Sequence, residues 1–115
     1  MLDKDVKSIC CLELKKIMEQ KEGFSWLVVD IRDPESFAKS HISGALHLDE
    51  LSMQEFVKKT DKNTPIVVCC YRGRSSLTVA SWLQQQGFLQ VYNLDGGYES
   101  WSQSFSQVEL TQEKI

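Results

Sequence analysis

Two short runs of apolar, largely β-branched residues most constrain the fold of this chain. Residues 26–31 (Trp-Leu-Val-Val-Asp-Ile) and 66–69 (Ile-Val-Val-Cys) have the length of strands, and neither alternates between apolar and polar positions. Strands without alternation are typical of parallel sheets, which are buried on both faces. The second run is the most strand-like segment of the chain, so we expect it at the centre of a sheet.

Helical patterns alternate with these runs. We expect helices over residues 11–19, ended by Gly23, over a short stretch capped by Asp33 with Pro34 in its first turn, and over residues 49–59, 75–86 and 98–104. A last short strand is expected over residues 91–94. Parallel strands need crossover connections, so the sequence predicts an α/β fold, a three-layer domain with a mainly parallel central sheet flanked by helices.

The length of the chain suits one domain. A chain of 115 residues leaves room for one hydrophobic core. We therefore expect a single domain over residues 1–115, with its core over about residues 6–104 and a polar C-terminal tail, residues 105–115, that frays. A monomer is the default expectation, and a small symmetric dimer stays open.

Composition and charge argue against several classes of function. The hydrophobic fraction of 42% and the charged fraction of 25% match average globular proteins, and no apolar run approaches the roughly 20 residues of a membrane-spanning helix. The net charge is −3 with Lys and Arg scattered along the chain, which argues against nucleic-acid binding. Residues 1–5 resemble neither a secretory signal nor a transit peptide, so we expect a cytoplasmic location.

Four cysteines occur as two adjacent pairs, Cys10–Cys11 and Cys69–Cys70. Neither pair has the two-residue spacing of zinc sites, and a reducing cytosol disfavours disulfides. Free cysteines are usually small buried hydrophobes, and we expect this of Cys10, Cys11 and Cys69. A sulfur-relay or resolving role for Cys69 stays open.

Cys70 is the candidate nucleophile. It follows the strand 66–69 directly, which places it at the carboxyl edge of the sheet, where α/β folds bind ligands. Gly73 permits a positive φ, so successive amides of the loop can turn inward, and the following helix N-terminus with Arg72 and Arg74 adds positive potential. These features predict a lowered pKa for Cys70. The alternative is a buried cysteine followed by an ordinary glycine turn.

The loop resembles the active-site loop of rhodaneses, most closely that of the small GlpE-type thiosulfate sulfurtransferases. Its residues are Cys70, Tyr71, Arg72, Gly73, Arg74, Ser75 and Ser76. Segments within residues 29–45 and 87–101 agree with the family in order and spacing, so the resemblance covers roughly residues 6–101. Ser40 and Ser43 stand at turn positions where the family often has Gly and Pro, and we expect only local effects.

The resemblance implies a sulfurtransferase that works by double displacement. The Cys70 thiolate would attack the outer sulfur of thiosulfate, or of another sulfane-sulfur donor, and become a persulfide. Cyanide, a small thiol or a thioredoxin-like protein would then accept the sulfur. No cofactor and no metal is implied.

The resemblance also implies that the residues from Tyr71 to Ser76 bind the substrate, with loop amides that stabilise the persulfide and the leaving sulfite. Arg72 and Arg74 either contact the substrate or point to solvent, and Ser75 and Ser76 either bind substrate oxygens or cap the helix.

Three further residues match positions of the family. We expect Asp30 and Arg32 to form an ion pair that fixes a turn. We expect no general-base role for His41, because an ionised sulfur needs no base.

Other functions stay open on the residues alone. Phosphatases of the dual-specificity cell-cycle type and related arsenate reductases share this fold and use a Cys, five residues, then an Arg that binds the oxyanion. Counting from Cys70 that position holds Ser76, and counting from Cys69 it holds Ser75, so the arginine is missing. A sulfur carrier or a partner-binding module is the other alternative, although binding modules of this kind usually lack the cysteine.

Overall fold

The computed structural model describes residues 6–20 and 25–114, so the helix end predicted at Gly23 lies outside the described residues. The strands form one sheet in the order β1-β5-β4-β2-β3, and every pair is parallel. Their bounds are β1 (Lys7–Ile9), β2 (Leu27–Asp30), β3 (Leu46–His47), β4 (Ile66–Cys69) and β5 (Val91–Leu94). The apolar run 66–69 is the central strand, as predicted.

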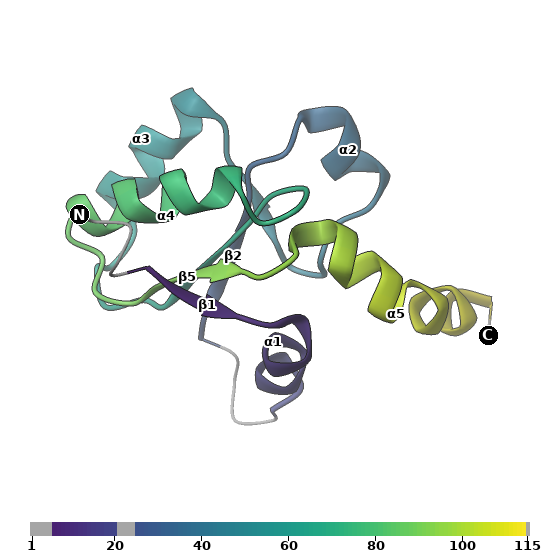
Figure 1. The fold of residues 1–115 in the computed structure, drawn as a ribbon. Helices are drawn as coiled ribbons and strands as arrows, with labels where there is room; N and C mark the ends of the chain where they lie inside the picture. The colour runs from purple at the N-terminus through teal and green to yellow at the C-terminus, as the bar shows by residue number, and fades with distance from the viewer. Residues whose placement is uncertain (1–5, 21–24, 115) are drawn as a thin grey trace.

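Helices cover both faces of the sheet. They are α1 (Cys11–Met18), α2 (Pro34–Lys39), α3 (Glu50–Lys59), α4 (Ser75–Gln85) and α5 (Gly97–Lys114). Figure 1 shows α3 and α4 on one side of the strands and α1 and α5 on the other. The predicted three-layer α/β architecture is therefore confirmed.

Side-chain caps start two of the helices where the sequence predicted. The Asp33 carboxylate accepts a hydrogen bond from the Ser36 amide at 3.0 Å, and Pro34 occupies the first turn of α2, where no amide donor is needed. The Asp49 carboxylate accepts from the Ser52 amide at 2.8 Å at the start of α3.

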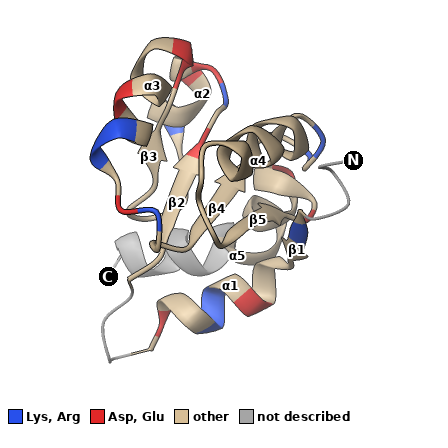
Figure 2. Cartoon of the chain, turned by 90° about the vertical axis from the view of Figure 1, so that its left-hand side faces the viewer, with Lys and Arg blue, Asp and Glu red and all other residues tan. Residues whose placement is uncertain are grey.

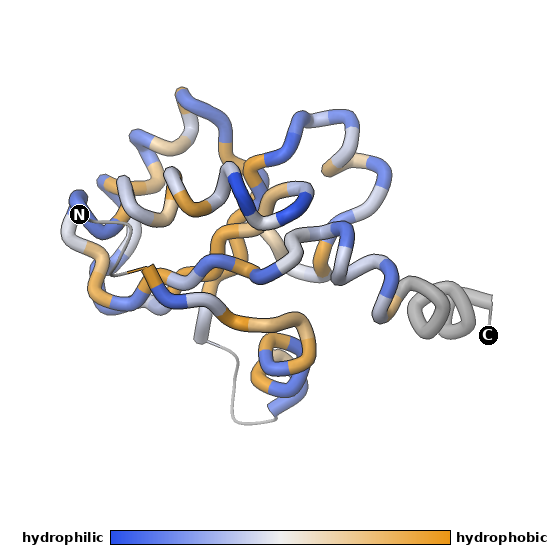
Figure 3. The backbone as a smooth tube through the Cα atoms, viewed as in Figure 1, coloured by the Kyte–Doolittle hydropathy of each residue, from blue (hydrophilic) through white to orange (hydrophobic). Residues whose placement is uncertain are grey.

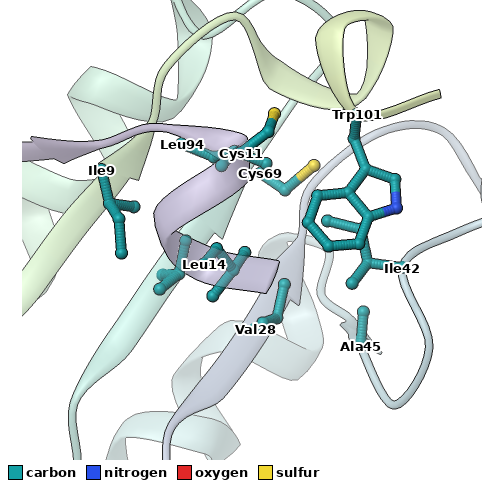
Figure 4. Close-up of a cluster of buried hydrophobic side chains, with 10 residues drawn as sticks. Ile9, Cys11, Leu14, Val28, Ile42, Ala45, Cys69, Leu94 and Trp101 are labelled. Atoms are coloured by element: carbon teal, nitrogen blue, oxygen red, sulfur yellow. The ribbon is translucent and has the colours of Figure 1, made fainter. Parts of the chain in front are cut away.

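The core consists of two clusters, one on each face of the sheet. Successive residues of β4 divide between them, because side chains of a strand alternate in direction. Val67 and Cys69 join α1 and α5 on one face, and Ile66 and Val68 join α3 and α4 on the other. Figure 4 shows the first cluster, with Cys69 and Trp101 among its side chains. In Figure 3 hydrophobic residues are concentrated in the interior strands, whereas β1 and β5 also carry hydrophilic residues and the loop that follows β4 is hydrophilic.

Three elements differ from the sequence predictions. The edge strand β3 was not predicted, because it has only two residues. The edge strand β1 was not predicted, because two of its three residues are exposed and it has no apolar run. Helix α5 continues to Lys114, whereas we expected a frayed tail beyond Phe105. Residues 106–114 contain no Gly and no Pro, so nothing in this segment interrupts the helical backbone.

The surface carries both signs of charge. Figure 2 shows acidic and basic residues interspersed on the helices and loops. No helix within the described residues is long and apolar enough to cross a membrane.

Candidate active site

Cys70 directly follows the central strand β4, at the carboxyl edge of the sheet. Its side chain is buried, with 4% of its surface exposed. The loop of residues 71–74 connects it to α4, which begins at Ser75. The sulfur atom therefore lies between the end of a strand and the positive end of a helix of eleven residues.

Three groups from the loop and the first turn of α4 contact the sulfur of Cys70. The amide N–H of Gly73 donates to Cys70 Sγ at 3.1 Å, and the amide N–H of Ser76 donates to it at 3.3 Å. The hydroxyl oxygen of Ser76 lies 3.2 Å from Sγ and accepts the S–H of the neutral thiol. The predicted inward turn of the loop amides is thus found at Gly73 and Ser76.

These contacts lower the pKa of the Cys70 thiol. Burial alone would raise this pKa. Hydrogen bonds from the Ser76 hydroxyl and from the amides of Ser76, Gly73 and Arg72 outweigh burial, and the pKa falls below its ordinary value. The direction agrees with the prediction from sequence.

Gly73 is required by both the conformation and the packing of the loop. Its φ is +87°, a region that disfavours residues with a Cβ atom. A Cβ atom there would lie 3.0 Å from the amide nitrogen of Gly96 and from the carbonyl oxygen of Leu94. The loop therefore packs against the turn between β5 and α5.

Asn93 is a site residue that the sequence analysis missed. It is buried in β5, with 3% of its surface exposed. Its side-chain amide donates to the carbonyl oxygen of Gly73 at 3.2 Å, and its side-chain oxygen accepts from the hydroxyl of Ser76. A polar residue inside the short apolar run Val-Tyr-Asn-Leu was the feature that could have identified it.

The two serines differ in their roles. Ser76 is fully buried and bonds Cys70 and Asn93, whereas Ser75 is exposed. Arg74, which is also exposed, is the residue preceding the first residue of α4, and no side-chain cap is formed there. Ser76 therefore faces the sulfur rather than capping the helix.

The remaining loop side chains point outward. Tyr71 is half-exposed, and its hydroxyl lies 3.0 Å from the Ser36 hydroxyl of α2. Arg72 is exposed and pairs with Glu99 of α5 at 3.3 Å. The structure thus brings Cys70, Gly73 and Ser76 together and leaves Tyr71, Arg72, Arg74 and Ser75 at the rim.

The other cysteines divide into buried and exposed thiols. Cys69 and Cys11 are buried in the core, as predicted, and burial is the main cause that raises the pKa of each thiol. Cys10 is exposed, so the prediction of a core position for it was wrong. Cys10 precedes α1, where its own amide donates to the Glu13 carboxylate at 3.1 Å, and this turn leaves its side chain outside the core.

Asp30 and Arg32 form the predicted ion pair, and it is buried. The Arg32 guanidinium binds both carboxylate oxygens of Asp30 at 2.8–3.1 Å and donates to the Ser40 carbonyl oxygen at 2.8 Å. Ser40 has a φ of −168°, an extended conformation open to any residue, so Ser is accommodated where the family often has Gly. His41 Nδ1 lies 2.7 Å from the carbonyl oxygen of Phe37, four residues earlier in the chain, so this contact is local.

The arrangement suits a sulfur nucleophile that holds negative charge. Amide donors, a hydroxyl and a helix N-terminus meet at one sulfur atom that has a lowered pKa. The position that holds arginine in the phosphatase pattern is occupied by Ser76, which is buried against the sulfur. In the described part of the chain, no three His, Cys, Asp or Glu side chains gather where they could hold a metal ion.

Comparison with known sequences gives a family match. The family model of the rhodanese-like domain matches residues 12–104. The thiosulfate sulfurtransferase GlpE of Ectopseudomonas mendocina is 52% identical over 79 residues, which are 69% of this chain and 72% of that protein. The protein of the same name from Pseudomonas putida is 48% identical over 94 residues, covering 82% of this chain and 80% of the relative.

Solved structures agree in fold. A rhodanese-like domain protein from Staphylococcus aureus superposes with a TM-score of 0.74 at 26% identity, covering 84% of this chain and 91% of the other. The rhodanese-like domain of an Anabaena protein gives a TM-score of 0.76 at 22% identity, covering 85% of this chain and 74% of the other. At that identity the second likeness supports the fold alone.

Proposed function

The chain belongs to the rhodanese family, as the resemblance of its loop predicted, and we propose that it is a thiosulfate sulfurtransferase whose Cys70 carries the transferred sulfur as a persulfide. The observation that carries this proposal is the environment of the Cys70 sulfur. The sulfur accepts hydrogen bonds from the backbone amides of Gly73 and Ser76 and contacts the Ser76 hydroxyl. The identity of about half of the aligned residues to two thiosulfate sulfurtransferases supports the activity.

In the first half-reaction the Cys70 thiolate attacks the outer sulfur of thiosulfate. A bond forms between Sγ and that sulfur, the bond between the two thiosulfate sulfurs breaks, and its electron pair leaves with sulfite. The negative charge then lies on the outer sulfur of the persulfide. The lowered pKa of Cys70 supplies the thiolate without a general base.

In the second half-reaction an acceptor attacks the outer sulfur and restores the Cys70 thiolate. Cyanide takes the sulfur and becomes thiocyanate. A thiolate acceptor, from a small thiol or a thioredoxin-like protein, becomes a persulfide. Both halves move one sulfur atom with its charge balanced, so the chain needs no cofactor and no metal for them.

The loop from Tyr71 to Ser76 is the proposed substrate-binding segment. The amides of Gly73 and Ser76 stabilise negative charge on the reacting sulfur, because they are fixed donors in a buried site. Arg72 and Arg74, both exposed at the rim, raise the local concentration of the thiosulfate dianion.

We propose that residues 1–115 form one rhodanese domain, with its core over about residues 6–104, which acts in the cytoplasm as a monomer, with a small symmetric dimer as the alternative. The four free cysteines, Cys10, Cys11, Cys69 and Cys70, support a reducing compartment. A reducing compartment also keeps Cys70 available as a thiolate between turnovers.

Steady-state kinetics test the proposal. Thiocyanate formation is measured while thiosulfate is varied at several cyanide concentrations, for the wild type and for Cys70→Ser and Cys10→Ser. Double displacement predicts parallel double-reciprocal lines, no turnover in Cys70→Ser, and wild-type rates in Cys10→Ser, which removes an exposed thiol.

Intersecting lines would instead mean direct transfer within a ternary complex. Turnover that survives in Cys70→Ser would exclude Cys70 as the sulfur-carrying residue. Labelling of Cys70 by a persulfide donor but not by thiosulfate would identify a sulfur carrier with another supplier.

A further inference from the structure

Asn93 is a buried polar side chain with a defined orientation. Its Nδ2 lies 3.2 Å from the Gly73 carbonyl oxygen, which can only accept a hydrogen bond. If the amide were inverted, Oδ1 would face that carbonyl oxygen and two acceptors would repel. Oδ1 therefore faces Ser76, and the Ser76 hydroxyl donates to it.

The two residues that Asn93 binds are the residues whose amides contact the sulfur of Cys70. Gly73 donates its N–H to Sγ at 3.1 Å and accepts from Asn93 through its carbonyl oxygen. Ser76 donates its N–H to Sγ at 3.3 Å and binds Asn93 through its hydroxyl. One side chain of β5 thus fixes both sides of the loop around Cys70.

We infer that Asn93 is a positioning residue for sulfur transfer, which holds Gly73 and Ser76 where two amides and one hydroxyl meet the Cys70 sulfur. This inference rests on the proposed function of the same site. Asn93 acts through the loop, since its own bonds go to Gly73 and Ser76 and not to the sulfur.

The Ser76 hydroxyl can form a hydrogen bond with Cys70 in either protonation state of the sulfur. In the thiol state the Cys70 S–H donates to Ser76 Oγ, and the hydroxyl donates its own proton to Asn93. When the thiol releases its proton to solvent, the hydroxyl turns about the Cβ–Oγ bond and donates to the thiolate. That rotation breaks the hydrogen bond from Ser76 to Asn93 Oδ1, so in the thiolate state Asn93 holds the loop through its hydrogen bond to the Gly73 carbonyl oxygen.

Loss of Asn93 has two opposing effects on the Cys70 thiolate. Removal of the Oδ1 acceptor leaves the hydroxyl proton free for the sulfur, which favours the thiolate. Loosening of Gly73 and Ser76 weakens three donors, which disfavours it. The inference predicts that the loosening has the larger effect. It weakens the hydrogen bonds from both amides, whereas the freed proton strengthens only the hydrogen bond from the hydroxyl.

Alkylation of Cys70 by iodoacetamide at a series of pH values measures the thiolate directly. Trypsin separates residues 63–72, with Cys69 and Cys70, from residues 8–15, with Cys10 and Cys11, so labelling can be followed on the first peptide. The variant is Asn93→Ala, and the matched control is Asn63→Ala, an exposed residue of the turn before β4. Both variants retain the charged residues of the loop, of the turn after β5 and of the start of α5, which are Arg72, Arg74, Asp95 and Glu99.

For Asn93→Ala the midpoint of the alkylation profile should move up by about one pH unit, which makes alkylation below the midpoint about tenfold slower. Asn63→Ala should leave the midpoint unchanged. Asn93→Asp keeps the shape of the side chain, but its carboxylate cannot donate to Gly73 and adds a negative charge near the sulfur. Both changes should raise the midpoint, so this variant gives an upper limit and Asn93→Ala gives the effect of positioning alone. An unchanged or lowered midpoint in either folded Asn93 variant would overturn the inference.

Alkylation requires no sulfur transfer, so the two claims fail separately. A wild type that forms no thiocyanate would overturn the proposed function, while a raised midpoint in Asn93→Ala would still support the positioning of the loop. A wild type that turns over, with an Asn93→Ala profile identical to its own, would overturn only the role of Asn93.

Discussion

Gly97 lies so close to Cys70 that a Cβ atom on Gly97 would be 2.5 Å from the Cys70 carbonyl oxygen. The amide of Tyr98 donates to the same oxygen at 2.7 Å, and the amide of Glu99 donates to the Tyr71 carbonyl oxygen at 2.9 Å. The first turn of α5 therefore supports the back of the loop, while Asn93 of β5 binds its inner side. Both supports lie far from the loop in sequence.

Gly97→Ala should destabilise the protein and displace Cys70. Gly97 has a φ of +62°, which a Cβ atom disfavours, and the new atom would also overlap the Cys70 backbone. We expect a loss of at least about 2 kcal/mol in the free energy of unfolding, together with slower alkylation of Cys70. Urea unfolding and labelling with iodoacetamide measure the two effects.

Gly44→Ala is the matched control. Gly44 has a φ of +81°, but a Cβ atom there would meet no atom within 4 Å. This variant should lose about 1 kcal/mol from its backbone conformation alone and keep the wild-type rate of alkylation. Equal losses in the two variants would mean that the contact between Gly97 and Cys70 contributes nothing.

The stability of the fold should depend on the ionisation of Cys70. Its pKa is lower in the folded chain than in the unfolded chain, so folding favours the thiolate. This contribution is fully present above the unfolded pKa of about 8.5 and is lost as the pH falls through the lowered value. The free energy of unfolding of the wild type, relative to Cys70→Ser, should therefore rise with pH from the lowered folded pKa up to the unfolded pKa. A difference that stays constant or falls over this range would show that the folded site does not favour the thiolate.

Arg72 and Arg74 should contribute unequally to the capture of thiosulfate. Glu99 lies 3.3 Å from Arg72 and offsets its charge, whereas no ion pair to Arg74 is found among the described residues. Arg74→Ala should raise the KM for thiosulfate several-fold, Arg72→Ala should raise it less, and Glu99→Gln should lower it. All three effects should weaken in high salt, because the groups are exposed. Equal effects of the two arginine variants would argue against the influence of Glu99.

Asp30→Asn should reduce the free energy of unfolding strongly, while the molecules that remain folded should form the persulfide at nearly the wild-type rate. The change leaves Arg32 buried without its counter-charge, and the loss of one partner of a buried pair costs about 3 kcal/mol or more. Urea unfolding measures this loss, and persulfide formation in native buffer measures the chemistry. The control is Glu19→Gln, which breaks an exposed pair with Lys15 and should cost about 0.5 kcal/mol or less. Similar losses in both variants would contradict a structural role for the Asp30–Arg32 pair.

Much of the fold could be predicted from local patterns. The apolar runs of β2 and β4 marked buried strands, and Asp33 and Asp49 marked the starts of helices, because these features depend on neighbours in sequence. Strand β1 could not be predicted, since its three residues are ordered by pairing with β5 at the other end of the chain.

The loop residues of the candidate site were predicted, whereas Asn93 and the contacts between elements were not. Cys70, Gly73 and Ser76 follow from the loop sequence alone. Their pairing with Asn93, and the pairing of Arg72 with Glu99, depend on how β5 and α5 pack against the loop. The direction of a side chain across two elements is set by tertiary packing, which a pattern of residue types does not contain.

Intact mass measurement tests the persulfide at Cys70 most directly. The reduced protein is mixed with thiosulfate, excess donor is removed, and the mass is recorded for the wild type and for Cys70→Ser. We predict that the wild type gains the mass of one sulfur atom, that cyanide removes this mass with release of an equal amount of thiocyanate, and that Cys70→Ser gains nothing. A wild type without the added mass, or a Cys70→Ser variant that gains it, would contradict the account.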